Sequence, residues 1–443
     1  MPHSRHSRIL AILVGLLLLV PSAPPARAYS VLSHEAIIDS AWPDHIRPLL
    51  LARFPSATQD ELREAHAYCY GGAIIQDAGY YPYGKRLFSD LAHYVRSGDF
   101  VLTLLRDAKT LDELAFALGA LAHYAADNEG HRIAVNLAVP ILYPELKKKY
   151  GDVVTYENDP LAHVKTEFGF DVLEVAKGRF APDAYRDFIG FEVAQPLLDR
   201  AFEETYGIKL STLMPREERA INSYRHDVSN LIPRAVKVAW ALKQDDIEKD
   251  QPGITRQKFL YNLSRASFEK RWGKEYRKPN FVAKLYAFFF RLIPKIGPLK
   301  ILTFRTPTPD TERMFEHSFN VTLDRYRALL DGYGAGTLQL PNDNFDVGAA
   351  TELGKYQLAD DTYAALLHRL TTQNFSGVDA TLRADILAFY SSPKAPPIDA
   401  SHSRDQSRSP SEIEEAHKEH HNTKLELARL KSLSPAPSAS PSQ

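Results

Sequence analysis

Cysteine is almost absent: Cys69 is the only one among 443 residues. An internal disulfide is therefore excluded, and with it the small secreted scaffolds that disulfides hold together. A chain of this length buries enough apolar surface to fold without such links, and bound metal ions can add to its stability. We expect Cys69, in the stretch AHAYCYGG, to be a buried apolar filler.

An excess of charge of one sign is also absent, because the formal net charge is −1. This balance indicates no general attraction to nucleic acid or to acidic surfaces. The apolar run at residues 9–20 is short for a membrane span, and it is followed by a small-x-small signature that ends at Ala28. These features predict a signal peptide, residues 1–28, cleaved after Ala28, and a secreted or periplasmic protein. An uncleaved anchor is the alternative.

Alternating patterns typical of strands are scarce, and there is no internal repeat. Helical periodicity dominates from Tyr29 to about residue 390, so we predict an all-α fold. One stretch differs: residues 70–85 are rich in Gly and Tyr and indicate an ordered loop. The main candidate helices cover residues 35–42, 89–108, 111–127, 144–151, 159–176, 187–207, 229–249 and 311–334.

The composition changes at residue 391, where Pro and Ser become frequent. We expect residues 391–443 to be a disordered tail. Within it, residues 412–433 can form one charged helix, which carries His417, His420 and His421. A solvated tail and a zinc-scavenging segment are both open interpretations of these histidines.

Histidines and acids recur at helical spacing in the stretch HYAADNEGH. His123, Asp127 and His131 lie at positions i, i+4 and i+8, so they lie on successive turns of one helix. Asp127, between the two histidines, is placed to bridge two metal ions. The i, i+4 pair recurs in HVKTEF as His163 and Glu167. Taken alone, each pair is either a set of metal ligands or a buried ion pair.

Three further side chains of the same chemistry precede these pairs. His34 lies near the predicted new N-terminus, Asp77 in the Gly/Tyr loop, and His93 after Ser89, which we expect to cap its helix. The whole set exceeds the needs of one ion. Imidazole and carboxylate without thiolate suit zinc in a catalytic site. After cleavage the α-amino group of Tyr29 becomes a further candidate ligand.

This set of residues resembles the zinc-dependent phospholipase C/P1-type nuclease superfamily, over residues 29–175. The resemblance implies an all-helical fold with a trinuclear zinc site. It does not cover residues 176–390, which we expect from their helical pattern to be a helical extension of the same or an adjoining domain. It implies one zinc ion held by Asp77, His93, His123 and Asp127. It implies a second ion held by Tyr29, His34 and Asp127, and a third held by His131, His163 and Glu167.

Two departures from the family pattern concern the terminus and one spacing. Tyr29 stands where Trp is usual, and its backbone atoms can still bind metal. The interval from Asp127 to His131 is shorter than in the secreted bacterial phospholipases C and the nucleases, and it is similar to the glycosylphosphatidylinositol-specific phospholipase D branch. The bond that is cleaved, C-type or D-type, is left open by this spacing.

The resemblance implies an exported zinc-dependent phosphodiester hydrolase, in first place a phospholipase C that acts on phospholipid headgroup esters. Zinc lowers the pKa of bound water from about 15.7 to about 7, so a metal-bound hydroxide is the expected nucleophile. Asp77 is the candidate catalytic residue, either as the group that orients or deprotonates the water or as a plain ligand. A P1-type single-strand nuclease is an alternative, although that branch generally carries disulfides. A non-catalytic, zinc-stabilised secreted binding protein is another.

Substrate contacts are indicated first by the tyrosines that follow Asp77, which are Tyr80, Tyr81 and Tyr83. They either line the pocket, stacking on a cationic headgroup or a base, or only pack the loop.

A second aromatic group lies in a segment rich in Lys and Arg, residues 270–305. Its candidate membrane-contact residues are Phe288, Phe289 and Phe290. Aromatic side chains among basic residues suit docking on anionic lipid headgroups or on a nucleic acid backbone. A core helix with snorkelling lysines is the other interpretation.

Overall fold

The computed structural model describes residues 30–177, 179–180, 190–250, 297–391 and 422–433. In these residues nearly all regular structure is helical, and one short antiparallel pair joins β1 (Asp343–Asn344) to β2 (Ala349–Ala350). The prediction of an all-α fold is confirmed. None of the described helices is both long and apolar enough to cross a membrane.

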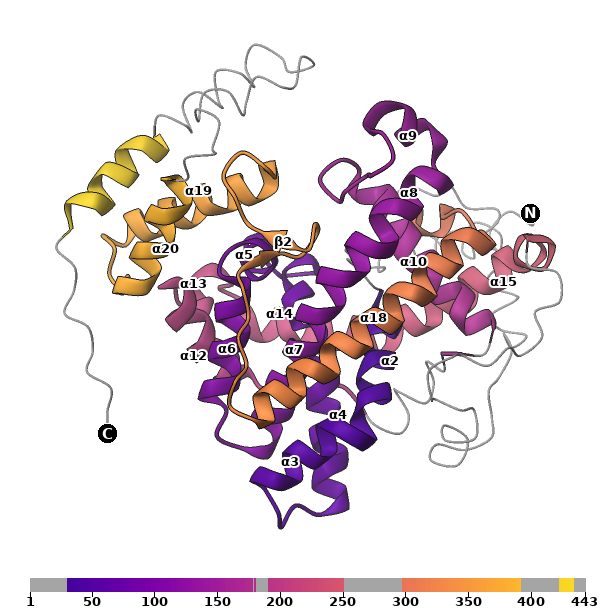
Figure 1. Ribbon diagram of the computed structural model, residues 1–443, viewed down its shortest axis with the longest axis horizontal. Helices are drawn as coiled ribbons and strands as arrows, with labels where there is room; N and C mark the ends of the chain where they lie inside the picture. Colours follow the sequence, from indigo (N-terminus) through magenta and orange to yellow (C-terminus); the bar gives the residue numbers. More distant parts are fainter. Residues whose placement is uncertain (1–29, 178, 181–189, 251–296, 392–421, 434–443) are drawn as a thin grey trace, which may run out of the picture.

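Helix α7 (Leu111–Gly130) forms the centre of the fold. It begins where the hydroxyl of Thr110 accepts a hydrogen bond from the backbone N–H of Glu113, and every residue from Leu114 to Gly130 is buried. Helices α4 (Gln59–Gly72) and α18 (Pro309–Gly334) pack against it, and Figure 1 shows α18 crossing in front of α7. Because α7 is enclosed, any polar side chain on it needs a partner inside the protein.

The helical path continues beyond α7 through one π-helical turn, η3 (His131–Val135), into α8 (Asn136–Leu142). In this turn the backbone N–H of Asn136 donates to the carbonyl oxygen of His131. π-helical turns are rare, and they are frequent at functional sites. This one begins at a predicted metal ligand.

The other elements surround this central path (Figure 1). Those before it are α2 (Val31–Ala41), η1 (Trp42–Ile46), α3 (Arg47–Arg53), η2 (Ile75–Tyr80), α5 (Arg86–Tyr94) and α6 (Ser97–Asp107). Those after it are α9 (Pro144–Tyr150), α10 (Pro160–Ala176), α12 (Gln195–Tyr206), α13 (Leu210–Leu213), α14 (Glu217–His226), η5 (Asp227–Leu231), α15 (Ile232–Asp250), η6 (Gly297–Thr303), α19 (Gln357–Thr372) and α20 (Ala380–Tyr390).

Two predicted helices were wrong in extent. The segment predicted as one helix over 89–108 is two helices, because Arg96 takes a left-handed conformation with φ of 50° and turns the chain between α5 and α6. Its guanidinium donates to the carbonyl oxygen of Thr205, which supports this turn from outside. The helix predicted over 187–207 begins only at Gln195; residues 190–194 are not helical, and 187–189 lie outside the described residues.

The predicted loop at 70–85 also differs from expectation. Its first residues complete α4, and Ile75–Tyr80 form the short helix η2, which carries Asp77. Ser89 does not cap a helix: α5 begins earlier, at Arg86, and the Ser89 hydroxyl accepts a hydrogen bond from the backbone N–H of Gly79. The bond ties η2 to α5, and these two elements carry Asp77 and His93.

One continuous hydrophobic core joins the described parts of the chain, from Val31 to Leu430. Cys69 is fully buried in it, as predicted. At the far end, residues 422–432 of the predicted tail form a helix, in which Leu430 is buried. The three tail histidines lie outside the described residues.

Helices α4 and α7 approach each other most closely at glycines. A Cβ atom on Gly119 would lie 2.0 Å from the carbonyl oxygen of Cys69, and one on Gly72 would lie 1.8 Å from the carbonyl oxygen of Phe116. The backbones are therefore in contact, and neither helix has a flexible side chain there that can give way.

We expect Gly119→Ala to lower the free energy of unfolding by about 1–3 kcal/mol or more, because overpacking forces the backbones apart. Gly332→Ala in α18 is the matched control, since its Cβ would meet its nearest neighbour at an ordinary 3.7 Å. That variant should be neutral or slightly stabilising, because Ala is the better helix former. Thermal unfolding of both variants measures the difference, and equal unfolding temperatures would contradict the close approach.

Candidate metal centre

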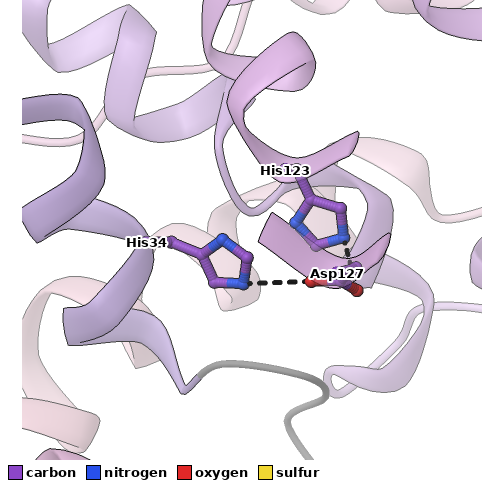
Figure 2. Close-up of side chains that lie close together, drawn as sticks. All are labelled: His34, His123 and Asp127. Atoms are coloured by element: carbon purple, nitrogen blue, oxygen red, sulfur yellow. Dashed lines mark ion pairs between the residues drawn. The ribbon is translucent and has the colours of Figure 1, made fainter. Parts of the chain in front are cut away.

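Two helices bring the first cluster together. His34 comes from α2, whereas His123 and Asp127 come from successive turns of α7, and Figure 2 shows both imidazoles directed at the same carboxylate. His34 Nε2 lies 3.5 Å from Asp127 Oδ1, and His123 Nε2 lies 3.2 Å from Asp127 Oδ2. All three side chains are fully buried.

The second cluster shares Asp127 and His123 with the first. His93 Nε2 lies 3.3 Å from Asp127 Oδ2 and 3.4 Å from Asp77 Oδ1, and it lies 3.4 Å from His123 Nε2. The two oxygens of Asp127 therefore face different partners: Oδ1 faces His34, and Oδ2 faces His93 and His123. This is the arrangement that a carboxylate bridging two cations requires.

The third cluster lies at the start of the π-helical turn. Glu167 Oε1 is 2.7 Å from His163 Nδ1 and 3.7 Å from His131 Nε2. All three side chains are fully buried. In each cluster, three ligand atoms lie within 4.8 Å of one another.

The opposite edges of three imidazoles are bound to backbone carbonyl oxygens. His93 Nδ1 is 2.7 Å from the oxygen of Ser89, His123 Nδ1 is 2.9 Å from that of Ala73, and His131 Nδ1 is 3.0 Å from that of Phe345. A carbonyl oxygen accepts only, so the Nδ1 atoms carry the protons when these rings are neutral. Their Nε2 lone pairs are then directed into the clusters, as in metal-binding histidines.

Several buried polar atoms of these clusters accept no hydrogen bond from any described residue. They are Asp77 Oδ1, both carboxylate oxygens of Asp127, His131 Nε2 and Glu167 Oε2. Leaving such atoms unsatisfied in a protein interior is costly. Nitrogen and oxygen donors without thiolate match a catalytic zinc site, so the donor set fits zinc.

A comparison with protein families decides the assignment. Residues 33–214 match the model of the family described as zinc dependent phospholipase C. Over these residues, which are less than half of the chain, the protein is similar to this family. The match contains every predicted ligand except Tyr29. Searches of curated proteins and of solved structures found no match.

The first two clusters concentrate negative charge at Asp77 and Asp127. Burial alone would lower the pKa of His93, but the carboxylates of Asp127 and Asp77 outweigh it and raise that pKa to about 9. Burial, with the neighbouring His123, lowers the pKa of His34 to about 4. Although burial opposes it, His123 and His93 hold the pKa of Asp127 well below its usual range. Without metal, a protonated His93 balances the negative charge of the two carboxylates, so the second cluster favours a cation.

Asp171 of α10 anchors the start of α2, and the sequence provided no indication of this role. Its carboxylate accepts hydrogen bonds from the Leu32 N–H at 3.0 Å and the Ser33 hydroxyl at 2.7 Å. These bonds cap the first turn of α2, whose N–H groups have no partner within the helix. Burial raises the pKa of Asp171 to about 7, against the hydrogen bonds from Ser33 and Ser30. The contact holds His34 and the chain just before it beside α7.

The three tyrosines after Asp77 do not form one surface. Tyr80 and Tyr81 are buried, whereas Tyr83 is 53 % exposed. The Tyr80 hydroxyl donates to Asp90, the Tyr81 ring packs edge-on against Tyr224, and the guanidinium of Arg219 lies over the Tyr83 ring. Their proposed role in lining the substrate pocket stays a prediction.

Four predicted contact residues lie outside the described residues, so their roles stay predictions. They are the N-terminal ligand Tyr29 and the candidate membrane-contact residues Phe288, Phe289 and Phe290.

Proposed function

We propose that the protein is an exported, zinc-dependent phospholipase C that hydrolyses phospholipid headgroup phosphodiesters. One observation carries this proposal: the segment that matches the family folds so that its predicted ligands form three buried, adjoining His/carboxylate clusters. Structural zinc sites are usually single four-coordinate centres. Adjoining clusters that share a carboxylate are typical of hydrolytic sites with more than one ion.

We propose three zinc ions, distributed as the family resemblance implies, with Tyr29 as a ligand after cleavage of the signal peptide. Bound zinc supplies positive charge for the phosphoryl oxygens and makes coordinated water more acidic. The contribution of Asp127 is to serve two clusters with its two oxygens. The contribution of the backbone carbonyls at Ser89 and Ala73 is to hold His93 and His123 in one tautomer and one orientation.

Asp77 is placed at the edge of the second cluster, on the short helix η2. Its Oδ1 atom faces His93 and makes no hydrogen bond with a described residue. It therefore has the capacity either to bind zinc or to accept the proton of an attacking water. We expect Asp77→Asn to lower kcat by about 10²–10⁴-fold, the usual contribution of a general base.

The zinc content of Asp77→Asn distinguishes the two roles. Full zinc with lost activity supports the role as base, whereas loss of zinc identifies Asp77 as a ligand. Asp90→Asn is the matched control, because that buried carboxylate bonds to Tyr80 and pairs with Arg86 instead of an imidazole. Wild-type turnover in Asp77→Asn would show that Asp77 is neither the general base nor a required ligand.

Parallel assays of the mature protein test the proposed activity. Phosphatidylcholine, phosphatidylinositol and single-stranded DNA are offered with and without a chelator, and the products are identified. Chelator-sensitive release of a phosphorylated headgroup from either lipid is expected. Cleavage of DNA alone would instead identify a nuclease, and inactivity on all three would favour a zinc-stabilised binding protein.

Export is tested separately from activity. Cleavage after Ala28 predicts a secreted chain whose N-terminal residue is Tyr29, and intact mass and N-terminal sequencing measure it. An unprocessed chain retained in a membrane fraction would contradict the prediction. It would also remove the amino group of Tyr29 as a ligand.

A further inference from the structure

A segment far outside the family match lies against the third cluster. Residues 343–350 form β1, a tight turn and β2, and the backbone N–H of Gly348 bonds to the carbonyl oxygen of Asn344. Gly348 has φ of +62°, and a Cβ atom there would lie 2.4 Å from the carbonyl oxygen of Asn128. Only glycine fits this conformation at this distance. The turn is therefore held directly against the end of α7, beside His131.

The two edges of the His131 ring face different groups. Its Nε2 faces Glu167 inside the cluster, at 3.7 Å. Its Nδ1, on the opposite edge, lies 3.0 Å from the carbonyl oxygen of Phe345 and 3.3 Å from Asp346 Oδ1. Asp346 thus lies behind the imidazole, on the side away from a metal held by Nε2. A carboxylate in this position orients a metal-binding histidine and raises its basicity.

The same segment reaches His163 through one side chain. His163 Nδ1 faces Glu167, and its Nε2 lies 2.8 Å from the carboxamide oxygen of Asn136. The carboxamide nitrogen of Asn136 in turn donates to the backbone oxygen of Asp346 at 2.7 Å. Both histidines of the third cluster are therefore oriented from residues 345–346, one directly and one through Asn136.

Asp346 is itself held in a fixed orientation. It is fully buried, and the hydroxyls of Tyr94 and Tyr356 both donate to its Oδ2 atom, the former at 2.7 Å. Its backbone N–H donates to the side-chain oxygen of Asn344. The tyrosines occupy Oδ2, and the other oxygen, Oδ1, lies 3.3 Å from His131 Nδ1, whose hydrogen bond goes to the carbonyl oxygen of Phe345. The carboxylate is thus preorganised, not a chance neighbour.

We propose that Asp346 is a positioning residue for the third zinc site, and that Asn136 carries its effect to His163. This inference rests on the proposed function, because it assumes that His131, His163 and Glu167 hold zinc. It adds that the site is incomplete within the family-matched segment, residues 33–214.

Zinc affinity of the full-length mature protein tests the proposal. Asp346→Asn keeps the shape of the side chain. Its amide oxygen is expected to accept the two tyrosine hydroxyls, which leaves the amide nitrogen, a donor, facing the Nδ1–H of His131, which is also a donor. We expect one class of zinc site to weaken by about 10–100-fold, the usual effect of losing such a partner. Competition with a chromophoric chelator measures the number of sites and their affinities.

Asp343→Asn is the matched control, on the same segment. The Asp343 carboxylate contacts Tyr124 and Arg325 and no predicted ligand, so zinc binding should stay at the wild-type level. Tyr356→Phe is a milder variant that removes one donor to Asp346, and a smaller loss of affinity at the same site is expected. It keeps the test valid where Asp346→Asn folds poorly.

The outcomes separate this inference from the proposed function. Wild-type zinc affinities in both Asp346→Asn and Tyr356→Phe would overturn the role of Asp346, even with a fully active enzyme. A loss shared equally by Asp343→Asn would also overturn it, because the effect would then belong to the whole segment. A wild-type protein that binds no zinc at all would overturn the proposed function instead.

Discussion

Asp127→Asn should abolish most of the activity. The substitution keeps the size of the side chain but removes the charge that two clusters share, and it leaves one oxygen where two are needed. Loss of zinc from both clusters removes several kcal/mol of transition-state stabilisation. At about 1.4 kcal/mol for each factor of ten, a fall in kcat/KM of about 1,000-fold or more is expected. Steady-state hydrolysis together with zinc content by elemental analysis measures it.

The matched control for this variant is Asp112→Asn. Asp112 lies on the same helix, in its first turn, away from the clusters. Its pKa is raised to about 6 by partial burial and by the neighbouring Glu64 and Glu61, so neutralising it should be tolerated. An Asp127→Asn protein with full zinc and near-wild-type activity would show that Asp127 does not bridge metals.

Removal of metal should lower stability as strongly as it lowers activity. A ligand that binds only the folded state stabilises it by about 2.7 kcal/mol at 100 times its Kd. Three independent sites would then contribute about 8 kcal/mol, and the unfolding temperature should fall on the order of 10 °C after chelation. Calorimetry with and without chelator, followed by addition of zinc, measures the loss and its recovery.

The chelator experiment also has an internal control. Asp127→Asn should show a smaller chelator effect, because two of its sites are already weakened. Superimposable unfolding curves of the wild type with and without chelator would contradict the presence of stabilising metal. Activity lost on chelation with unchanged stability would indicate that only a weakly bound ion is needed.

Local periodicity predicted the part of the site that lies within single helices. The i, i+4 spacing of His123 and Asp127, and of His163 and Glu167, became visible because α7 and α10 are regular over those residues. His34, Asp77 and His93 were included for their chemistry and for the family resemblance. The structure brings these side chains together, but their binding of zinc stays a prediction.

The supporting residues could not be predicted in this way. Asn136 and Asp346 are linked by a hydrogen bond across 210 residues, and no sequence period relates positions that far apart. The cluster of Asn and Asp at 342–346 was the only local signal. Asp171 was missed for the same reason, since its partners at the start of α2 lie 138–139 residues away.

Helix ends were missed where a tertiary contact overrides local preference. Nothing in the local sequence around Arg96 indicates a left-handed residue, because glycine or asparagine usually occupies such positions. The turn is supported by its bond to Thr205, more than a hundred residues away. Serine is a common helix cap, but the Ser89 hydroxyl accepts a hydrogen bond from the backbone N–H of Gly79 instead.

The π-helical turn at His131–Val135 determines the direction in which the side chains of α8 point. In an α-helix each residue advances about 100°, so His131 and Asn136 would point about 140° apart. The wider turn, closed by a hydrogen bond between these two residues, brings them back onto one face, where both reach the third cluster. A regular α-helix of the same length would rotate Asn136 away from His163, whereas deleting one residue between them would leave the pair four positions apart, about 40° from each other and still on one face. The π-helical turn therefore sets the direction of Asn136, because it places a residue five positions after His131 on the same face of the helical path.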